Sequence, residues 1–118
     1  MPNDNADARS ILPDLSNPMD NEALAHLRTN ADGAAVFLKA LSHEGRLMIL
    51  CALAQGEKSV TELEQMLSSR QAAVSQQLAR LRQENLISAR REGKQIFYSL
   101  TDDRARRVIE LVYELFCA

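Results

Sequence analysis

The sequence contains no tryptophan, and aromatic residues account for only 4% of its 118 residues. Its core must therefore be built from Leu, Ile, Val and Ala, which favours a helical protein. No apolar run approaches the roughly 20 residues that span a bilayer, and the acidic first residues lack the apolar centre of a secretory signal. We therefore expect a cytoplasmic protein without a membrane partner, in a reducing compartment where its two cysteines are not a structural framework.

Charge is unevenly distributed along the chain. The net charge is −2, yet residues 70–107 carry nine bases against four acids, whereas residues 1–36 carry two bases against six acids. A locally basic segment is a candidate for binding a polyanion, because contact depends on the local field rather than on the net charge. A basic face that is merely solvated is the alternative, and charge alone does not separate the two.

The chain length and an ordinary composition, 46% hydrophobic and 25% charged, indicate one globular domain. Residues 1–20 lack periodicity, so we expect a disordered or mobile N-terminal tail before a domain over residues 21–118. Apolar spacing predicts helical structure from about Glu22, capped by Asp20 or Asn21 and weakened at Gly33, which suggests two helical pieces.

The next helix is expected over residues 43–55, capped by Ser42 and stopped by Gly56. Ser59 and Glu62 have the spacing of a capping box and begin a short third helix.

A fourth helix is expected from about Arg70 to Glu84, where Ser68 and Gln71 repeat the capping spacing. The short gap between the third and fourth helices, Ser68 to Arg70, predicts a helix-turn-helix.

The periodicity then changes from 3.6 to 2. Residues 87–91 and 96–100 alternate on either side of Glu92-Gly93-Lys94, which predicts a hairpin with a charged tip. Thr101 with Asp102 and Asp103 caps a last helix with a wide apolar face. A helix-turn-helix followed by a basic hairpin is a winged helix, so the expected fold is mainly α with a small β-hairpin.

Side chains suited to DNA follow the fourth helix and the hairpin. Gln pairs with adenine, Arg with guanine, and Ser with either base or phosphate, while a basic hairpin can lie on the phosphate backbone or in a minor groove. The alternatives are a plain polar helix face and an ordinary exposed turn. The DNA-binding candidates are Ser68, Arg70, Gln71, Ser75, Gln76, Gln77, Arg80, Arg90, Arg91 and Lys94.

The segments LKALSHEGRLMIL, VSQQLARLRQENLI and EGKQIFYSL resemble the ArsR family of bacterial winged-helix repressors, over residues 36–117. The resemblance implies a homodimer whose interface is formed by the first and last helices. It also implies two recognition helices that enter successive major grooves of an inverted-repeat DNA operator. Gln77 departs from the pattern, since many members have His there.

Many members of this family sense metals, but the ligands they use are missing here. A common pair of cysteines falls on Ser59 and Thr61, and at the last helix Asp102 is retained while Arg104 stands in place of a His. A zinc site needs about four N, S or O donors, so we expect neither a metal nor another cofactor. His43 is interpreted as a capping or packing residue.

The two cysteines are Cys51 and Cys117. Helical spacing alone favours two small buried hydrophobic residues and does not show that the sulfurs meet. One branch of the family, the biofilm growth-associated and sulfide-responsive repressors, has single cysteines at both positions. That likeness implies a thiol sensor in which persulfides or polysulfides link the pair, release the operator and derepress sulfide-oxidation genes.

Other functions remain open from sequence. The regulator could respond to peroxide, to other oxidants or to an unidentified ligand, or use its winged helix for protein contacts only. A small thiol enzyme, such as a peroxidase or sulfur carrier, needs an activated thiolate. Cys51 lies mid-helix among aliphatic residues and Cys117 lies at a helix C-terminus, where the dipole opposes a thiolate. We therefore predict that the protein is not an enzyme.

Overall fold

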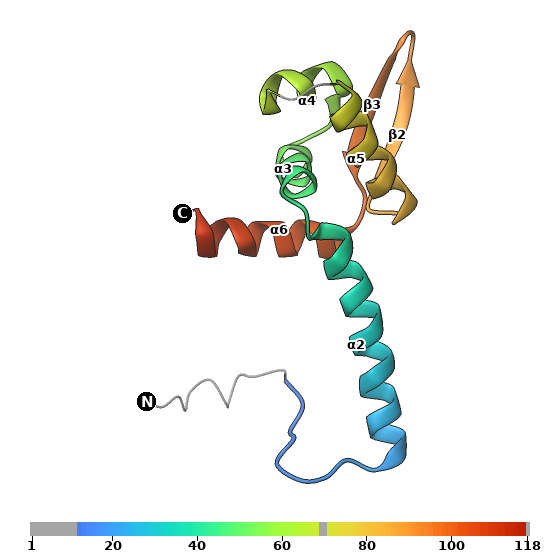
Figure 1. The fold of residues 1–118 in the computed structure, drawn as a ribbon, viewed down its shortest axis with the longest axis vertical. Coiled ribbons are helices and arrows are strands. Elements are labelled where there is room, and N and C mark those ends of the chain that lie inside the picture. Colours follow the sequence, from blue (N-terminus) through green and yellow to red (C-terminus); the bar gives the residue numbers. More distant parts are fainter. Residues whose placement is uncertain (1–11, 69–70, 118) are drawn as a thin grey trace. The chain divides into compact units, whose positions relative to one another are not determined.

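The computed structural model describes residues 12–68 and 71–117, whose elements are shown in Figure 1. The chain divides into two compact units, Met1–Ala34 and Ala35–Ala118. The mainly helical structure with a small antiparallel sheet confirms the predicted fold class. The elements are α2 (Asn21–Leu41), α3 (Glu44–Leu53), β1 (Lys58–Ser59), α4 (Val60–Leu67), α5 (Gln71–Gln83), β2 (Ile87–Glu92), β3 (Gln95–Leu100) and α6 (Asp103–Phe116).

Helix α2 begins as predicted but is not divided. The backbone N–H of Ala23 donates to Asp20 Oδ1 at 2.7 Å, so Asp20 supplies the cap. The helix runs through Gly33 without a break, which corrects the expectation of two pieces. One glycine in a helix interior costs only about 1 kcal/mol relative to alanine, and twenty other helical residues offset that cost.

The cap of α3 is His43 rather than Ser42. His43 is extended, with φ −160° and ψ 130°, and its Nδ1 accepts the backbone N–H of Gly45 at 3.0 Å. Ser42 still belongs to the end of α2, because its N–H donates to the Lys39 carbonyl at 3.1 Å. The prediction of a capping Ser42 is therefore wrong, and the interpretation of His43 as a capping residue is confirmed.

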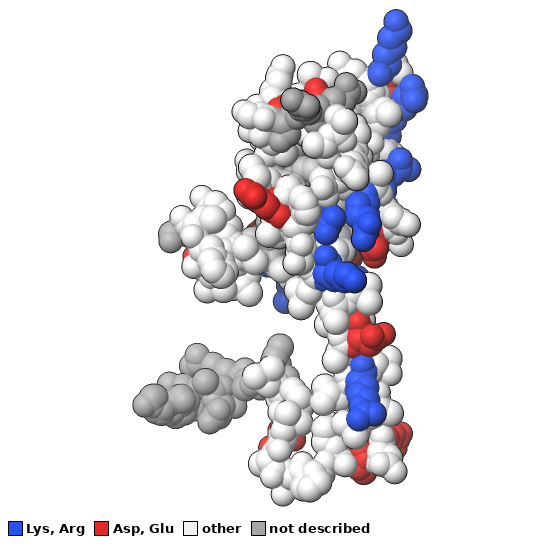
Figure 2. All heavy atoms as spheres, viewed as in Figure 1, with Lys and Arg blue, Asp and Glu red and all other residues white. Residues whose placement is uncertain are grey.

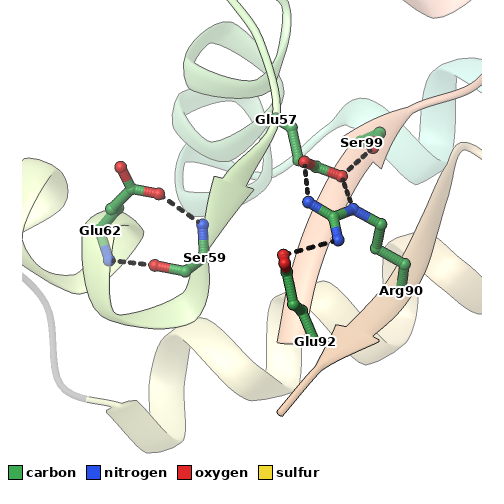
Figure 3. A network of polar contacts seen from close by, with 6 residues as sticks. All are labelled: Glu57, Ser59, Glu62, Arg90, Glu92 and Ser99. Carbon is green, nitrogen blue, oxygen red and sulfur yellow. Dashed lines mark hydrogen bonds and ion pairs between the residues drawn. The ribbon is translucent and has the colours of Figure 1, made fainter. Parts of the chain in front are cut away.

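Helices α4 and α5 form the predicted helix-turn-helix. At the start of α4, Ser59 Oγ accepts from the Glu62 N–H at 3.1 Å, and Glu62 Oε1 accepts from the Ser59 N–H at 2.8 Å, which confirms the capping box (Figure 3). Ser68 ends α4 in the left-handed conformation, with φ 51°. The second predicted capping box depends on the Gln71 side chain, which lies outside the described residues.

The sheet has three strands in the order β1–β3–β2, all antiparallel. The hairpin pairs Ile87 with Leu100 and Glu92 with Gln95, so its turn consists of Gly93 and Lys94. Gly93 has φ +64°, a conformation that glycine adopts without strain. The sequence predicted the hairpin, whereas β1 was not predicted because two residues are too short to show a period.

One apolar core joins the end of α2 with α3, α4, α5, α6, β2 and β3. Leu50, Leu63 and Leu81 are completely buried, so the sheet, α3, α4 and α5 are held as one packed body. The buried apolar side chains are Ala40, Leu41, Ile49, Leu50, Ala52, Leu53, Leu63, Val74, Leu78, Leu81, Leu86, Ile87, Tyr98, Ala105 and Ile109.

Candidate nucleic-acid interface and cysteine pocket

Helix α5 has one buried face and one open face. Val74, Leu78 and Leu81 are at most 2% exposed and fix the helix on the core. Among the predicted DNA-binding residues of α5, Ser75, Gln76 and Arg80 are exposed. The packed face thus holds α5 while the opposite face presents hydrogen-bonding side chains to solvent.

Three more of the predicted contacts, Ser68, Arg70 and Gln71, lie in the sequence at or just before the start of α5. Ser68 is exposed at the end of α4. Arg70 and the side chain of Gln71 lie outside the described residues.

Gln77 faces inward, unlike the other α5 candidates in the described part of the chain. It is half-buried, and its Oε1 accepts from Arg46 Nη1 at 3.2 Å. Its Nε2 lies 3.5 Å from His43 Nε2. The polar atoms of Gln77 therefore contact the start of α3, although the side chain is only partly buried.

The hairpin formed by β2 and β3 carries the basic residues of the predicted wing. Arg91 and Lys94 are exposed, and no ion pair joins either of them to another described residue. Figure 2 shows Lys and Arg side chains gathered along the side of the second unit where the hairpin and α5 lie. The basic segment of the sequence thus forms a surface that includes both parts of the candidate interface.

Arg90 makes ion pairs within the protein, although its side chain is 51% exposed. Its Nε and Nη2 donate to the two carboxylate oxygens of Glu57 at 2.8 Å each, and its Nη1 donates to Glu92 at 3.0 Å (Figure 3). The guanidinium also lies 4.7 Å from the centre of the Phe97 ring, and Ser99 Oγ donates to Glu57 at 3.3 Å.

The ion pairs of Arg90 perturb both partners in the expected direction. The hydrogen bond from Arg90 lowers the pKa of Glu57, and the carboxylates of Glu57 and Glu92 raise the pKa of Arg90. Arg90 thus stays charged and is paired with two carboxylates, and its bonds to Glu57 tie the hairpin to the loop between α3 and β1.

The two cysteines line a common cavity. Cys51 on α3 is half-buried, Cys117 just after α6 is exposed, and both are free thiols. The cavity has a volume of about 300 Å³, and its other lining residues are Glu44, Leu47, Met48, Ile109, Val112 and Tyr113. The expectation that both cysteines are buried hydrophobic residues is thus wrong for Cys117, because α6 leaves it at an open end.

A hydrogen bond at a distance from the cysteines also joins α3 to α6. Arg106 Nη1 donates to the Ala54 carbonyl at 2.6 Å, at the end of α3.

Asp102 caps α6 by accepting the N–H groups of Arg104 at 2.8 Å and Ala105 at 3.2 Å. Its side chain is 12% exposed, and the Arg104 hydrogen bond is the main reason that the pKa of Asp102 is lowered.

Metal sites and membrane-spanning helices are two further features to consider in the described residues. No group of three or more His, Cys, Asp or Glu side chains in residues 12–68 and 71–117 is placed to hold a metal ion. No helix within the same ranges combines the length and the apolar character that crossing a bilayer requires.

Comparison with known proteins gives consistent matches. Residues 43–89 match the family model described as bacterial regulatory protein, arsR family. The chain is 48% identical over 106 residues to the biofilm growth-associated repressor of Agrobacterium fabrum strain C58, covering 88% of this chain and 91% of that protein.

Solved structures give the same picture. The transcriptional repressor BigR from Xylella fastidiosa superposes with a TM-score of 0.75 at 43% identity, covering 85% of this chain and 99% of that one. Reduced HlyU from Vibrio cholerae N16961 superposes with a TM-score of 0.75 at 41% identity, covering 79% and 98%.

Proposed function

The chain belongs to the ArsR family of bacterial regulatory proteins, and on this premise we propose that it is a homodimeric winged-helix repressor of transcription with a thiol switch. Its affinity for a double-stranded DNA operator is controlled by Cys51 and Cys117, which sense persulfides and polysulfides. The observation that carries the switch is the single cavity lined by both cysteines. The relatives are regulators of transcription, so the protein is not a thiol enzyme.

DNA binding is supported by the open face of α5 and the tip of the hairpin. Ser75, Gln76 and Arg80 are exposed on the second helix of a helix-turn-helix, the helix that enters a major groove. Arg91 and Lys94 are the exposed bases of the wing, suited to phosphate contacts. Ser68, Arg70 and Gln71, at or just before the start of α5, remain proposed contacts.

A homodimer is supported by apolar side chains that the second unit leaves open. Leu111, Leu115 and Phe116 on α6 are 51%, 66% and 81% exposed, and Val36 and Leu38 near the end of α2 are both 54% exposed. Contiguous exposed apolar surface marks interaction sites in soluble proteins. Pairing of these helices with a second copy would place two α5 helices on the two halves of an inverted repeat.

The thiol chemistry proceeds in balanced steps. The thiolate of one cysteine attacks the outer sulfur of a persulfide RSSH, forming Cys–S–SH and releasing the thiol RSH. The second cysteine then attacks the inner sulfur, forming the disulfide and releasing hydrogen sulfide. If both cysteines first become persulfides, their reaction releases hydrogen sulfide and leaves a bridge of three sulfurs. The shared cavity supports a link within one subunit.

Such a link has a physical route to the DNA-binding helix. It would join α3 to α6, which carries the exposed apolar face. Glu44 and Met48 line the cysteine cavity and also a second cavity of about 400 Å³ that reaches Val74 and Gln77 of α5. A shift of α3 would therefore change both the cysteine cavity and the cavity beside α5. Coupling of this kind is typically about 1–3 kcal/mol, or about 5–150-fold in affinity.

A gel shift tests the proposal with DNA from upstream of the protein's own gene. Wild type, Cys51→Ser and Cys117→Ser are compared after reduction and after polysulfide treatment. All three should bind when reduced, polysulfide should release only the wild type, and mass spectrometry should find a link between the two cysteines in the released protein. Release of either serine variant, or a wild type that stays bound, contradicts the thiol switch.

Two further arms separate the alternatives. Peroxide treatment of the reduced wild type distinguishes a general oxidant response from a response to reactive sulfur. In a general oxidant response, peroxide should release the DNA as polysulfide does. A salt titration distinguishes DNA binding from a winged helix used only for protein contacts, because DNA affinity falls steeply as salt rises.

A further inference from the structure

We propose that Arg46 and Gln77 act together as positioning residues that set the angle of helix α5 on α3, so that Gln77 contributes to operator binding without reading a base. This inference rests on the proposed DNA-binding function. It assigns a role to the one described α5 candidate whose side chain is turned away from the open face.

Arg46 links three helices through one planar group. Its Nε donates to the Ala40 carbonyl at 2.7 Å, and its Nη1 donates to Gln77 Oε1 at 3.2 Å. Ala40 lies in the last turn of α2, where carbonyl groups lack a partner within the helix. Arg46 itself belongs to α3, so its guanidinium connects the end of α2 with α5. Lysine has one compact donor group and cannot reproduce this fork.

The orientation of Gln77 follows from the chemistry of its neighbours. A guanidinium has donors only, so the amide oxygen of Gln77 must face Arg46. Pairing with adenine requires the oxygen and the nitrogen of a Gln amide together. Here the oxygen faces Arg46 and the nitrogen lies 3.5 Å from the His43 ring. Both ends of the amide are thus directed at the start of α3.

The surrounding packing restricts Gln77 further. Gly45 lies close to both His43 and Gln77. A Cβ atom added at Gly45 would lie 3.2 Å from the His43 ring and 3.7 Å from Gln77 Cγ. The His43 ring is itself fixed, because its Nδ1 accepts the Gly45 N–H as the cap of α3. Gln77 therefore packs beside a capped helix start, while its neighbour Gln76 is exposed.

A double-mutant cycle tests whether the two residues act through one another. Affinity for the upstream DNA and for unrelated DNA of the same length is measured by fluorescence anisotropy for wild type, Arg46→Lys, Gln77→Ala and the double variant. Each single change should weaken binding to the upstream DNA about tenfold, equivalent to about 1.4 kcal/mol. The double variant should be no weaker than the weaker single variant, and binding to unrelated DNA should change little.

The matched control is Gln76→Ala, alone and with Arg46→Lys. Gln76 precedes Gln77 but is exposed, so its effect should multiply with that of Arg46→Lys. Thermal unfolding of every variant checks that the fold persists.

Gln77→Glu separates positioning from base reading. A carboxylate still accepts from Arg46, so this variant should bind the upstream DNA more tightly than Gln77→Ala. A base-reading Gln77 predicts the reverse, because Glu offers no donor to adenine and brings negative charge to DNA.

The outcomes distinguish the two proposals. A wild type that does not bind the DNA overturns the proposed function and this inference with it. If the wild type binds, any of three results overturns the positioning role alone. Gln77→Ala could bind as tightly as wild type, the effects of Arg46→Lys and Gln77→Ala could multiply, or Gln77→Glu could bind more weakly than Gln77→Ala.

Discussion

At the residue scale, three basic side chains of the hairpin differ in what they can offer to DNA. Arg90 already donates to two carboxylates, whereas Arg91 and Lys94 are exposed without an ion pair to another described residue. A cation that contacts a phosphate releases counterions from DNA, which favours binding. A cation that stays paired with Glu57 contacts no phosphate and releases none. The basic residues of the sequence are therefore not equivalent, although they look alike in the printed chain.

Replacing these residues one at a time should separate them. Arg91→Ala and Lys94→Ala should each weaken DNA binding and reduce the slope of log affinity against log salt by about 1. Arg90→Ala should leave that slope nearly unchanged, because the Arg90 guanidinium is already paired with Glu57 and Glu92 and is not proposed to contact phosphate. The measurement is a salt titration of DNA affinity. An Arg90→Ala slope change equal to that of Arg91→Ala would mean that Arg90 leaves Glu57 to bind phosphate.

Asp102 offers a second test at the residue scale, on stability. Asp102→Ala removes the cap of α6 and should lower the free energy of unfolding by about 1 kcal/mol. Asp102→Asn is the control, since it retains the capping oxygen but not the charge. Chemical denaturation at neutral pH measures both, and an Ala variant as stable as wild type would contradict the capping role.

The stability difference between wild type and Asp102→Asn should depend on pH, because the pKa of Asp102 is lowered in the folded protein. Because its pKa is lower in the folded state than in the unfolded state, its charge stabilises the fold at pH values above the unfolded pKa. That contribution is lost as the pH falls through the lowered folded pKa. The stability difference between wild type and Asp102→Asn should therefore narrow on acidification, and a difference that widened would contradict the assignment.

At the element scale, the periodic parts of the chain were predictable and the local exceptions were not. The 3.6 and 2.0 periods gave α3 to α6 and the hairpin, because each buries a repeating apolar set such as Val74, Leu78 and Leu81. The cap of α3 was misassigned because Ser, but not His, ranks as a strong cap. The backbone of His43 decided the outcome, since its extended conformation aims Nδ1 at the Gly45 N–H.

The sequence supplied the residue types of the candidate site but not the partners of those residues. The residues of α5 and the hairpin have the chemistry of DNA contacts, yet sequence does not tell that Gln77 meets Arg46 31 residues earlier, or that Arg90 meets Glu57 33 residues earlier. Both pairs join elements brought together by the core. The cysteines are alike in this respect, because only the packing of α3 on α6 places them on one cavity.

The hairpin turn is an element whose conformation depends on one residue. Gly93 has φ +64° and nothing within 4 Å of an added Cβ, so a substitution there is penalised by backbone strain rather than by a clash. Gly93→Ala should destabilise the protein by about 1–2 kcal/mol. Lys94→Ala is the matched control, because Lys94 is not among the residues with positive φ. Equal stabilities of the two variants would show that the turn relaxes without cost.

At the scale of the whole molecule, the second unit has a packed core beneath an open apolar face. Leu111, Leu115 and Phe116 project from α6, the same helix that buries Ala105 and Ile109 in the core. A helix apolar on both sides indicates two partners, one within the chain and one outside it. In the proposed homodimer, the outside partner is a second copy of the chain, which also supplies the second recognition helix.

Charge placed on this face should therefore separate the subunits. Leu115→Glu puts a carboxylate where the proposed interface excludes water, and an unpaired buried charge is costly. Met66→Glu is the matched control, because Met66 is 50% exposed on α4 and lies outside the proposed interface. Sedimentation analysis should find a monomer for Leu115→Glu and a dimer for Met66→Glu. A dimeric Leu115→Glu protein would place the interface elsewhere.

The same variant tests whether operator binding depends on the proposed dimer. In that dimer, once one α5 helix is bound, the linked helix of the second copy would meet its half-site at a high effective concentration, and linkage of this kind raises affinity by about 10²–10⁴-fold. Leu115→Glu changes no residue of the proposed DNA interface, so its loss of affinity for an inverted repeat should fall in that range, while its affinity for a single half-site should match that of wild type. Equal losses on both DNAs would instead indicate that the substitution disturbs the winged helix itself.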